Sequence, residues 1–252
     1  CALPILYPSI YQKRMKKLGV DIVTEIDTPA HATSFWYVDP SIMLDTVHVN
    51  IYDEEARNFV KSVYDEFLDP ENPVFLGEAF NVGVDEYPPG NNEQVRAYMD
   101  EMIKYIDSKG IEARLWSGLN DVVSDQPYTG YAGETPVSNK GVFHFYNDAV
   151  ADLTTMLEGE YRMINNMYQN LYIVPVVVNG TNDFLNLEKV YDTWEAGIVS
   201  FGEGEIMPGH PLLLGSETSI WNDAKAGCSE FDLFDRAKDQ IMLMAEKNWY
   251  GR

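Results

Sequence analysis

The sequence predicts an α/β fold of the (β/α)8 barrel class, and three observations support this prediction. Strand-like apolar runs alternate with segments of helical period along the whole chain, an order typical of a parallel sheet covered by helices. The chain contains neither G-x-G-x-x-G nor G-x-x-x-x-G-K-[ST], although a doubly wound sheet usually carries such a phosphate loop after its first strand. The predicted strand ends are rich in carboxylate, amide and aromatic side chains, and a barrel places its chemistry at such ends.

The first half of the chain predicts helices and strands in alternation. A helix over residues 10–19 has basic residues in its last turns, which the helix dipole favours, and ends at a glycine. The β-branched run at 20–27 predicts a buried strand, and the segment 53–68 is amphipathic at helical period. Residues 80–86 form the next predicted strand. Residues 91–110 form the next helix, which starts with asparagine and ends with glycine.

The second half continues this alternation. The predicted strands there are residues 111–119, 140–148, 171–179 and 212–223. The predicted helices are residues 149–167 and 230–249, and the stretch 183–211 is irregular. We therefore expect one domain over residues 1–252 that holds about six of the eight β/α units of a TIM barrel, with the first two missing. An open parallel sheet buries its core poorly, so we expect no activity from this stretch alone.

The composition excludes several classes of function. The 252 residues include 40 acidic and 18 basic residues, and the formal charge of -22 repels nucleic acid and anionic membrane surfaces. No apolar run approaches the roughly 20 residues that a membrane-spanning helix needs. Two cysteines, Cys1 and Cys228, cannot form a disulfide framework. His48, His144 and His210 lack metal-ligand spacing, so we expect neither a metal nor a cofactor.

The stretch FNVGVDEY at 80–87 suggests the chemistry, because an apolar run ends there in the adjacent carboxylates of Asp85 and Glu86. Trp116 and Trp221 stand at the ends of other predicted strands. Sugar rings present apolar faces to aromatic side chains and hydroxyls to acids and amides. Glycosidic cleavage needs a proton donor and a group that stabilises positive charge. The pattern therefore favours a carbohydrate site, and a carboxylate pair that merely begins a solvated loop is the alternative.

Six segments resemble the motifs of glycoside hydrolase family 20, the β-N-acetylhexosaminidases. GVDIVTEIDTPAHATSFW is similar to the EID-x-P-x-H motif of that family, and FNVGVDEY resembles its H-x-G-x-D-E segment. The later segments RLWSGL, VFHFYND, NDFLNLEKVYDTWE and LLLGSETSIWND match in the same order. The resemblance covers essentially the whole chain and is greatest to long, multidomain bacterial surface enzymes. It implies an extracellular or cell-surface location.

The resemblance implies distinct roles for three predicted catalytic residues, Asp85, Glu86 and His31. In this family the 2-acetamido oxygen of the substrate attacks the anomeric carbon and forms an oxazolinium intermediate. Glu86 then corresponds to the general acid and base, and Asp85 to the group that orients the acetamido N–H. His31 corresponds to the histidine that approaches the acid. We expect Asp85 and its surroundings to favour the protonated form of Glu86.

The resemblance also implies a set of substrate-binding residues, which are Trp116, Tyr146, Asp183, Phe184, Trp194 and Trp221. The tryptophans at 116 and 221 match those that wall the sugar subsite, and Tyr146 stands where a tryptophan is common. Phe184 stands where the family has a tyrosine that bonds the acetamido carbonyl. The loss of that hydroxyl is expected to cost about 2–4 kcal/mol of transition-state stabilisation. Asn81 replaces the usual histidine of H-x-G-x-D-E.

The predicted function is removal of terminal β-linked N-acetylhexosamine from a glycan by a retaining hydrolase. One alternative is release of a disaccharide such as lacto-N-biose. A second is a catalytically impaired glycan-binding barrel, which the changes at Asn81 and Phe184 suggest. A barrel glycosidase that uses Glu217 as an enzyme nucleophile with Glu86 is a further alternative.

Overall fold

The computed structural model describes residues 8–69, 71, 74–88, 90–116, 118–119, 130–147, 153–175, 183–199, 206–207, 209–221 and 228–250. Its centre is a six-stranded parallel sheet with the strand order β1-β2-β3-β4-β5-β7. These strands are β1 (Thr24–Thr28), β2 (Ala79–Gly83), β3 (Glu112–Trp116), β4 (Val142–Phe145), β5 (Arg162–Asn165) and β7 (Leu213–Ser216). Two short strands, β6 (Tyr172–Ile173) and β8 (Ser219–Ile220), pair in parallel with each other.

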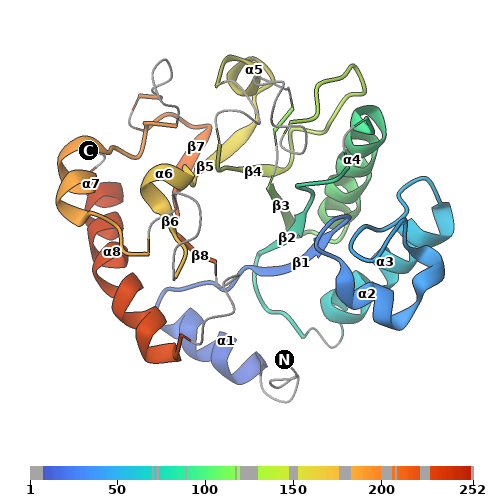
Figure 1. Ribbon diagram of the computed structural model, residues 1–252, viewed down its shortest axis with the longest axis horizontal. Coiled ribbons are helices and arrows are strands. Elements are labelled where there is room, and N and C mark those ends of the chain that lie inside the picture. The colour runs from blue at the N-terminus through green and yellow to red at the C-terminus, as the bar shows by residue number, and fades with distance from the viewer. Residues whose placement is uncertain are drawn as a thin grey trace.

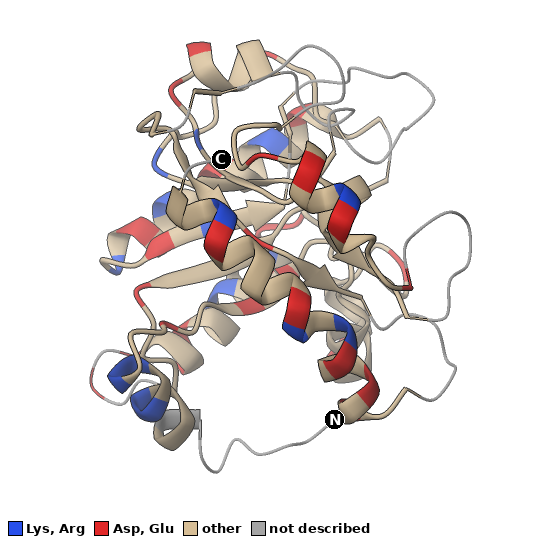
Figure 2. Ribbon diagram, turned by 90° about the vertical axis from the view of Figure 1, so that its left-hand side faces the viewer, with Lys and Arg blue, Asp and Glu red and all other residues tan. Residues whose placement is uncertain are grey.

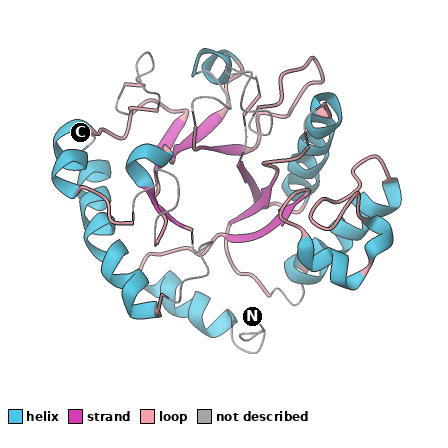
Figure 3. Ribbon diagram, in the orientation of Figure 1, coloured by secondary structure: helices cyan, strands magenta, loops and turns pink. Residues whose placement is uncertain are grey.

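The strands curve around a common axis and the longer helices lie outside them (Figure 1). The helices are α1 (Pro8–Lys17), α2 (Thr33–Val38), the 3-10 helix η1 (Pro40–Ile42), α3 (Glu54–Leu68), α4 (Asn92–Ser108), α5 (Leu153–Glu158), α6 (Tyr168–Leu171), α7 (Leu187–Thr193) and α8 (Glu230–Tyr250). Figure 3 shows the strands as an inner arc and the helices as an outer layer. This arrangement confirms the prediction of an α/β fold with an incomplete barrel.

Local sequence explains the long helices α3 and α4. The side chain of Asp53 accepts a hydrogen bond from the backbone N–H of Glu55 and so caps the start of α3. Four α3 residues at intervals of four positions turn toward the sheet and are buried, namely Ala56, Val60, Tyr64 and Leu68. Gly110 follows α4 with a φ of 74°, a left-handed conformation that glycine adopts without steric cost.

The main core lies between the sheet and helices α3 and α4. Every residue of β2 is buried, as expected for a parallel strand covered on both faces. The hydroxyl of Thr28, at the end of β1, lies 2.6 Å from the Tyr64 hydroxyl and 2.8 Å from the Tyr98 hydroxyl. This buried group of three hydroxyls joins the end of β1 to both α3 and α4. A second, smaller cluster consists of Leu171, Val190, Trp194 and Met244.

The structure corrects the predicted helix over residues 149–167. Within its described part the helix covers only Leu153–Glu158, and the chain then enters strand β5. Glu160 follows Gly159 and adopts a left-handed φ of 54°, which a helix cannot continue. The segment Arg162–Asn165 after it, too short to show a period, forms β5 between β4 and β7, and its last three residues are buried.

The last two predicted strands also differ from the observed ones. Of the predicted strand 171–179, Tyr172 and Ile173 form β6, and residues 176–179 lie outside the described residues. The predicted strand 212–223 divides into β7, which joins the main sheet, and β8, which pairs with β6.

Charged side chains lie mainly on the outer helices and loops, with acidic ones in excess (Figure 2). Among the described helices, none combines the length and the apolar character that crossing a bilayer requires.

Candidate active site

Neighbouring strand ends bring the three predicted catalytic residues together. His31 follows β1, Asp85 and Glu86 follow β2, and the two strands pair directly, with Thr28 opposite Gly83. The His31 Nε2 atom lies 3.3 Å from Glu86 Oε2 and 3.8 Å from Asp85 Oδ2. The adjacent acids therefore share one imidazole, and the three side chains meet at the carboxyl end of the sheet in a group that we call the candidate catalytic cluster.

The backbone around this cluster is strained. His31, Val84 and Glu86 have left-handed φ angles of 52°, 70° and 49°. Non-glycine residues rarely adopt this conformation, and a β-branched valine does so least readily. A hydrogen bond of 2.9 Å from the Val84 N–H to the Thr28 carbonyl holds the turn after β2 against β1. Such strain is characteristic of functional sites, where the surrounding structure enforces it.

Asp27 packs against the backbone of β2 at Gly83. A Cβ atom on Gly83 would lie 1.6 Å from Asp27 Oδ1, and Gly83 has a φ of 81°. The position therefore requires glycine for two independent reasons. Asn81, where the family has histidine, is buried two residues earlier and accepts a 2.9 Å hydrogen bond from the Gly83 N–H.

The carboxylates of the cluster differ strongly in proton affinity. Burial raises the pKa of Asp27 to about 9, and the nearby Asp85 adds to this rise. Burial also raises the pKa of Asp85 to about 7, against the charge of His31. The hydrogen bond with Glu86 raises the pKa of His31 to about 9, whereas the same bond lowers the pKa of Glu86. The structure thus differs from our expectation that the surroundings favour protonated Glu86, because His31 stabilises its ionised form.

An aromatic wall lies at the ends of β3, β4 and β8. The ring of Trp116 lies 5.6 Å from that of Trp221 and 6.4 Å from that of Tyr146, with steep interplanar angles. The Trp116 Nε1–H donates a 2.8 Å hydrogen bond to Glu25 Oε2. Three of the predicted substrate-binding residues, Trp116, Tyr146 and Trp221, therefore meet in one wall, and we use this name for them below.

The sequence reasoning missed Tyr172 in β6. Its ring lies 5.5 Å from the Trp221 ring, so it extends the aromatic wall. Burial raises the pKa of its hydroxyl, and the charges of Asp85 and Glu217 contribute to the rise. The apolar pattern of LYIVPVVVN predicts one buried strand over 171–179, and within such a strand a tyrosine is expected to be a core residue. Helix α6 separates Tyr172 from the end of β5, so its place at the site follows from the packing of these short elements and not from a sequence period.

The other three predicted substrate-binding residues lie elsewhere. Phe184 is 55% exposed, and its ring stacks 4.5 Å from the guanidinium carbon of Arg236 in α8. Asp183 forms a 2.9 Å ion pair with the same arginine. Trp194 is fully buried in the small cluster with Val190 and Met244. Asp183 and Phe184 therefore pack against α8, and Trp194 lies in the core. None of the three belongs to the aromatic wall.

Asp27, His31 and Asp85 each offer one ligand atom, and these atoms all lie within 4.8 Å of one another. Carboxylates and imidazole are ligands that divalent transition metals accept. His31, however, already contacts Glu86, and the sequence predicts no metal. We therefore treat this group as part of the candidate catalytic cluster.

Comparison with curated proteins shows two related enzymes, whereas no protein-family model matches the chain. The chain is 21% identical, over 95% of its length, to the lacto-N-biosidase of Bifidobacterium bifidum, and covers 23% of that protein. It is 23% identical, over 94% of its length, to β-hexosaminidase subunit B2 of Dictyostelium discoideum, and covers 44% of it. The chain thus spans less than half the length of either relative.

Solved structures with the same fold cover nearly the whole chain. Dispersin B superposes with a TM-score of 0.77 at 16% identity, over 96% of this chain and 76% of that one. A GH20 catalytic module of the pneumococcal exo-β-D-N-acetylglucosaminidase StrH gives a TM-score of 0.75 at 17% identity, over 98% of this chain and 64% of that one. The chain thus has the fold of these barrel structures. The resemblance to glycoside hydrolase family 20 predicted from the motifs is confirmed, because both curated relatives are enzymes of the hexosaminidase type.

The contact between Asp27 and Gly83 leads to a prediction about stability. Replacing Gly83 with alanine should lower the free energy of unfolding by about 3–5 kcal/mol, because it combines a left-handed φ with a steric clash. Gly110→Ala is the matched control, since its φ of 74° is similar but nothing lies within 4 Å of the added carbon. It should cost about 1–2 kcal/mol. Urea unfolding monitored by circular dichroism measures both, and equal losses would contradict the close contact.

The raised pKa of Asp27 leads to a prediction about pH. Its folded-state pKa exceeds the ordinary value near 3.8, so its stabilising contribution is complete below about pH 4 and is lost as the pH rises toward about 9. Asp27→Asn cannot ionise, so the unfolding free energy of the natural protein should fall relative to this variant across that window.

Urea midpoints at about pH 5, 7 and 9 measure this difference, with Asp235→Asn on the exposed face of α8 as the control. If the difference between the natural protein and Asp27→Asn stays constant with pH, the buried carboxylate is not the source of the dependence.

Proposed function

We propose that the chain is the catalytic barrel of a retaining β-N-acetylhexosaminidase. The reaction would remove terminal β-linked N-acetylhexosamine from a glycan through an oxazolinium intermediate. The observation that carries this proposal is the pair Asp85 and Glu86, held together with His31 at the carboxyl ends of β1 and β2. Adjacent carboxylates suit a 2-acetamido sugar, because one can orient the acetamido group while the other exchanges a proton.

His31, Glu86 and Asp85 have different roles in the proposed reaction. In the free protein His31 holds a proton beside ionised Glu86. Transfer of this proton over the 3.3 Å between His31 Nε2 and Glu86 Oε2 makes Glu86 the acid that protonates the departing oxygen. Asp85 accepts the acetamido N–H and stabilises the positive charge that develops on the acetamido group. Glu86, now ionised, then activates the water that opens the oxazolinium ring.

Tyr172 supplies the hydroxyl that Phe184 cannot. It stands beside Trp221 in the aromatic wall, within the field of Asp85, whereas position 184 packs on α8. Its hydroxyl would donate to the acetamido carbonyl oxygen as that oxygen attacks the anomeric carbon. A hydroxyl from Tyr172 would make up for the one missing at position 184, which favours an active hydrolase over a catalytically impaired binding barrel.

The relatives and neighbours support a glycan that ends in a 2-acetamido sugar. A β-N-acetylglucosaminidase from Vibrio harveyi was solved in complex with N-acetylglucosamine. The curated relatives are a lacto-N-biosidase and a β-hexosaminidase subunit. An extracellular or cell-surface location follows from the family resemblance and belongs to the same proposal.

Release of a disaccharide such as lacto-N-biose is the second candidate. Two observations favour it, namely the match to a lacto-N-biosidase over 95% of the chain and the smaller ring of Tyr146 in the aromatic wall. Rates with aryl β-lacto-N-bioside and aryl β-N-acetylglucosaminide separate the candidates, because an exo-acting hexosaminidase leaves the lacto-N-bioside intact.

The role of Glu86 is tested by hydrolysis of aryl β-N-acetylglucosaminides and β-N-acetylgalactosaminides in the protein that carries this chain. Glu86→Gln should lower kcat/KM by about 100- to 10,000-fold for a nitrophenyl leaving group. The loss should be much smaller for a dinitrophenyl group, which departs without a proton. Exposed Glu66→Gln on α3 is the control. Equal losses with both leaving groups would exclude general-acid catalysis by Glu86.

The role of Tyr172 has a matched test within the chain. Tyr172→Phe should lower kcat by about 100- to 1,000-fold, as expected for removal of one donor to a developing charge. Phe184→Tyr adds a hydroxyl where the motif alone would place it and should not raise kcat. A gain of activity in Phe184→Tyr, with little loss in Tyr172→Phe, would return the role to position 184.

A further inference from the structure

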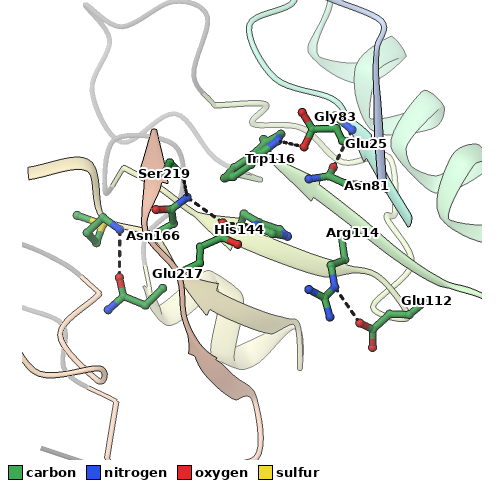
Figure 4. Close-up of polar contacts among 12 residues, drawn as sticks. Glu25, Asn81, Gly83, Glu112, Arg114, Trp116, His144, Asn166, Glu217 and Ser219 are labelled. Atoms are coloured by element: carbon green, nitrogen blue, oxygen red, sulfur yellow. Dashed lines mark hydrogen bonds and ion pairs between the residues drawn. The ribbon is translucent and has the colours of Figure 1, made fainter. Parts of the chain in front are cut away.

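Beside the aromatic wall, a chain of contacts joins residues on or just after five strands of the main sheet. Its members are Glu25 of β1, Trp116 of β3, His144 of β4, Glu217 after β7 and Asn166 after β5 (Figure 4). None of the proposed catalytic roles uses Glu25, His144, Glu217 or Asn166. We refer to these four residues as the bracket.

One end of the bracket fixes the polar edge of the indole. Trp116 is 7% exposed, and its Nε1–H donates to Glu25 Oε2 at 2.8 Å. Glu25 lies on β1, two strands away in the sheet. The strand between them is β2, whose Asn81 pairs with Glu25 in the sheet. A buried indole N–H that lost this acceptor would have to turn toward another partner.

The other end of the bracket supports the face of the indole. The His144 ring packs 4.4 Å from the Trp116 ring, and His144 is 3% exposed. Its Nδ1 atom bonds Glu217 Oε1 at 2.5 Å, and the same oxygen accepts a 2.8 Å hydrogen bond from Asn166 Nδ2. His144 therefore cannot rotate without breaking its bond to Glu217.

The bracket also reaches the second tryptophan of the wall. Asn166 Nδ2 donates to the Ser219 hydroxyl at 2.8 Å. Ser219 begins β8, and this strand leads directly to Trp221, whose backbone N–H bonds the Ile173 carbonyl at 2.9 Å. A continuous path of contacts thus connects the supports of Trp116 and Trp221, whose rings lie 5.6 Å apart.

We propose that Glu25 and the His144–Glu217 pair are positioning residues that hold Trp116 against Trp221 and so set the size of the slot for the 2-acyl group. This inference rests on the proposed function for its substrate, an N-acetylhexosaminide. The positioning residues do not touch the sugar. A rigid slot admits an acetyl group and rejects a longer acyl group, because one extra methylene must displace a fixed ring.

The arrangement of Glu217 also bears on the alternative in which it is an enzyme nucleophile. Its Oε1 atom accepts from both His144 and Asn166. The bracket therefore assigns this carboxylate to support of the aromatic wall.

The decisive measurement compares aryl N-acetyl- and N-propionylglucosaminides in variants of the protein that carries this chain. Glu25→Leu removes the acceptor and should reduce the preference for N-acetyl by about tenfold in kcat/KM. Glu25→Gln keeps an amide oxygen for the indole and should retain most of the preference. Glu112→Gln is the matched control. It removes a carboxylate from the face of β3 that also carries Trp116, but Glu112 contacts Arg114 and Arg162 and not Trp116.

A readout that does not depend on activity separates this inference from the proposed function. The indole N–H resonance of Trp116, assigned by its absence in Trp116→Phe, should shift and exchange faster in Glu25→Leu than in Glu25→Gln. An unchanged resonance in Glu25→Leu overturns the inference even if hydrolysis is observed. Failure of the natural protein to cleave any N-acetylhexosaminide overturns the proposed function, while the resonance still tests the bracket.

Two further variants keep the test valid if Glu25→Leu does not fold. Glu25→Ala deletes the acceptor without adding an apolar side chain and should give the same loss of preference. In a Trp116→Phe background, Glu25→Ala should change the preference by less than about twofold, because the group that it positions is already absent. Full additivity of the two substitutions would show that Glu25 acts independently of Trp116.

Discussion

The contact of the Asp27 carboxylate with the bare backbone of Gly83 is the constraint on which the rest of the site depends. It brings the ends of β1 and β2 close together, and His31, Val84 and Glu86 in the turns beyond them have left-handed conformations. Those conformations turn His31 and the pair Asp85 and Glu86 toward one another. The candidate catalytic cluster is therefore a consequence of how two strands end, and the loops that carry it have little freedom to adopt another arrangement.

The same closeness explains the electrostatics of the site. Several acids that crowd together under partial burial cannot all ionise, so protons remain on some of them at neutral pH. His31 determines which acid is ionised. Its contact lowers the pKa of Glu86, whereas the pKa values of Asp27 and Asp85 stay raised. The cluster thus holds an exchangeable proton one contact away from the atom that would need it.

Much of the architecture could be predicted from the sequence, and the failures share a physical cause. Hydrophobic period and capping residues predict the long helices α3, α4 and α8. Apolar runs predict the strands β1 to β4. Strand β5 is four residues long, too short for a period to identify it, and only its neighbours in the sheet make it a strand. Tyr172 lies in the two-residue strand β6, which no period identifies either, and the motif NDFLN points to Phe184 instead. Motif spacing located His31, Asp85 and Glu86, whereas the direction in which Trp194 points depends on how α7 and α8 pack.

Hydrogen bonds among the buried hydroxyls of Thr28, Tyr64 and Tyr98 connect helices α3 and α4 to the end of β1, beside the candidate active site. Thr28 immediately precedes the loop that carries His31, so a small rotation of α3 or α4 would alter the approach of the imidazole to its acid. Substitutions at Tyr64 or Tyr98, on the outer helices, would therefore change the pKa of His31 indirectly, without a contact to the imidazole itself.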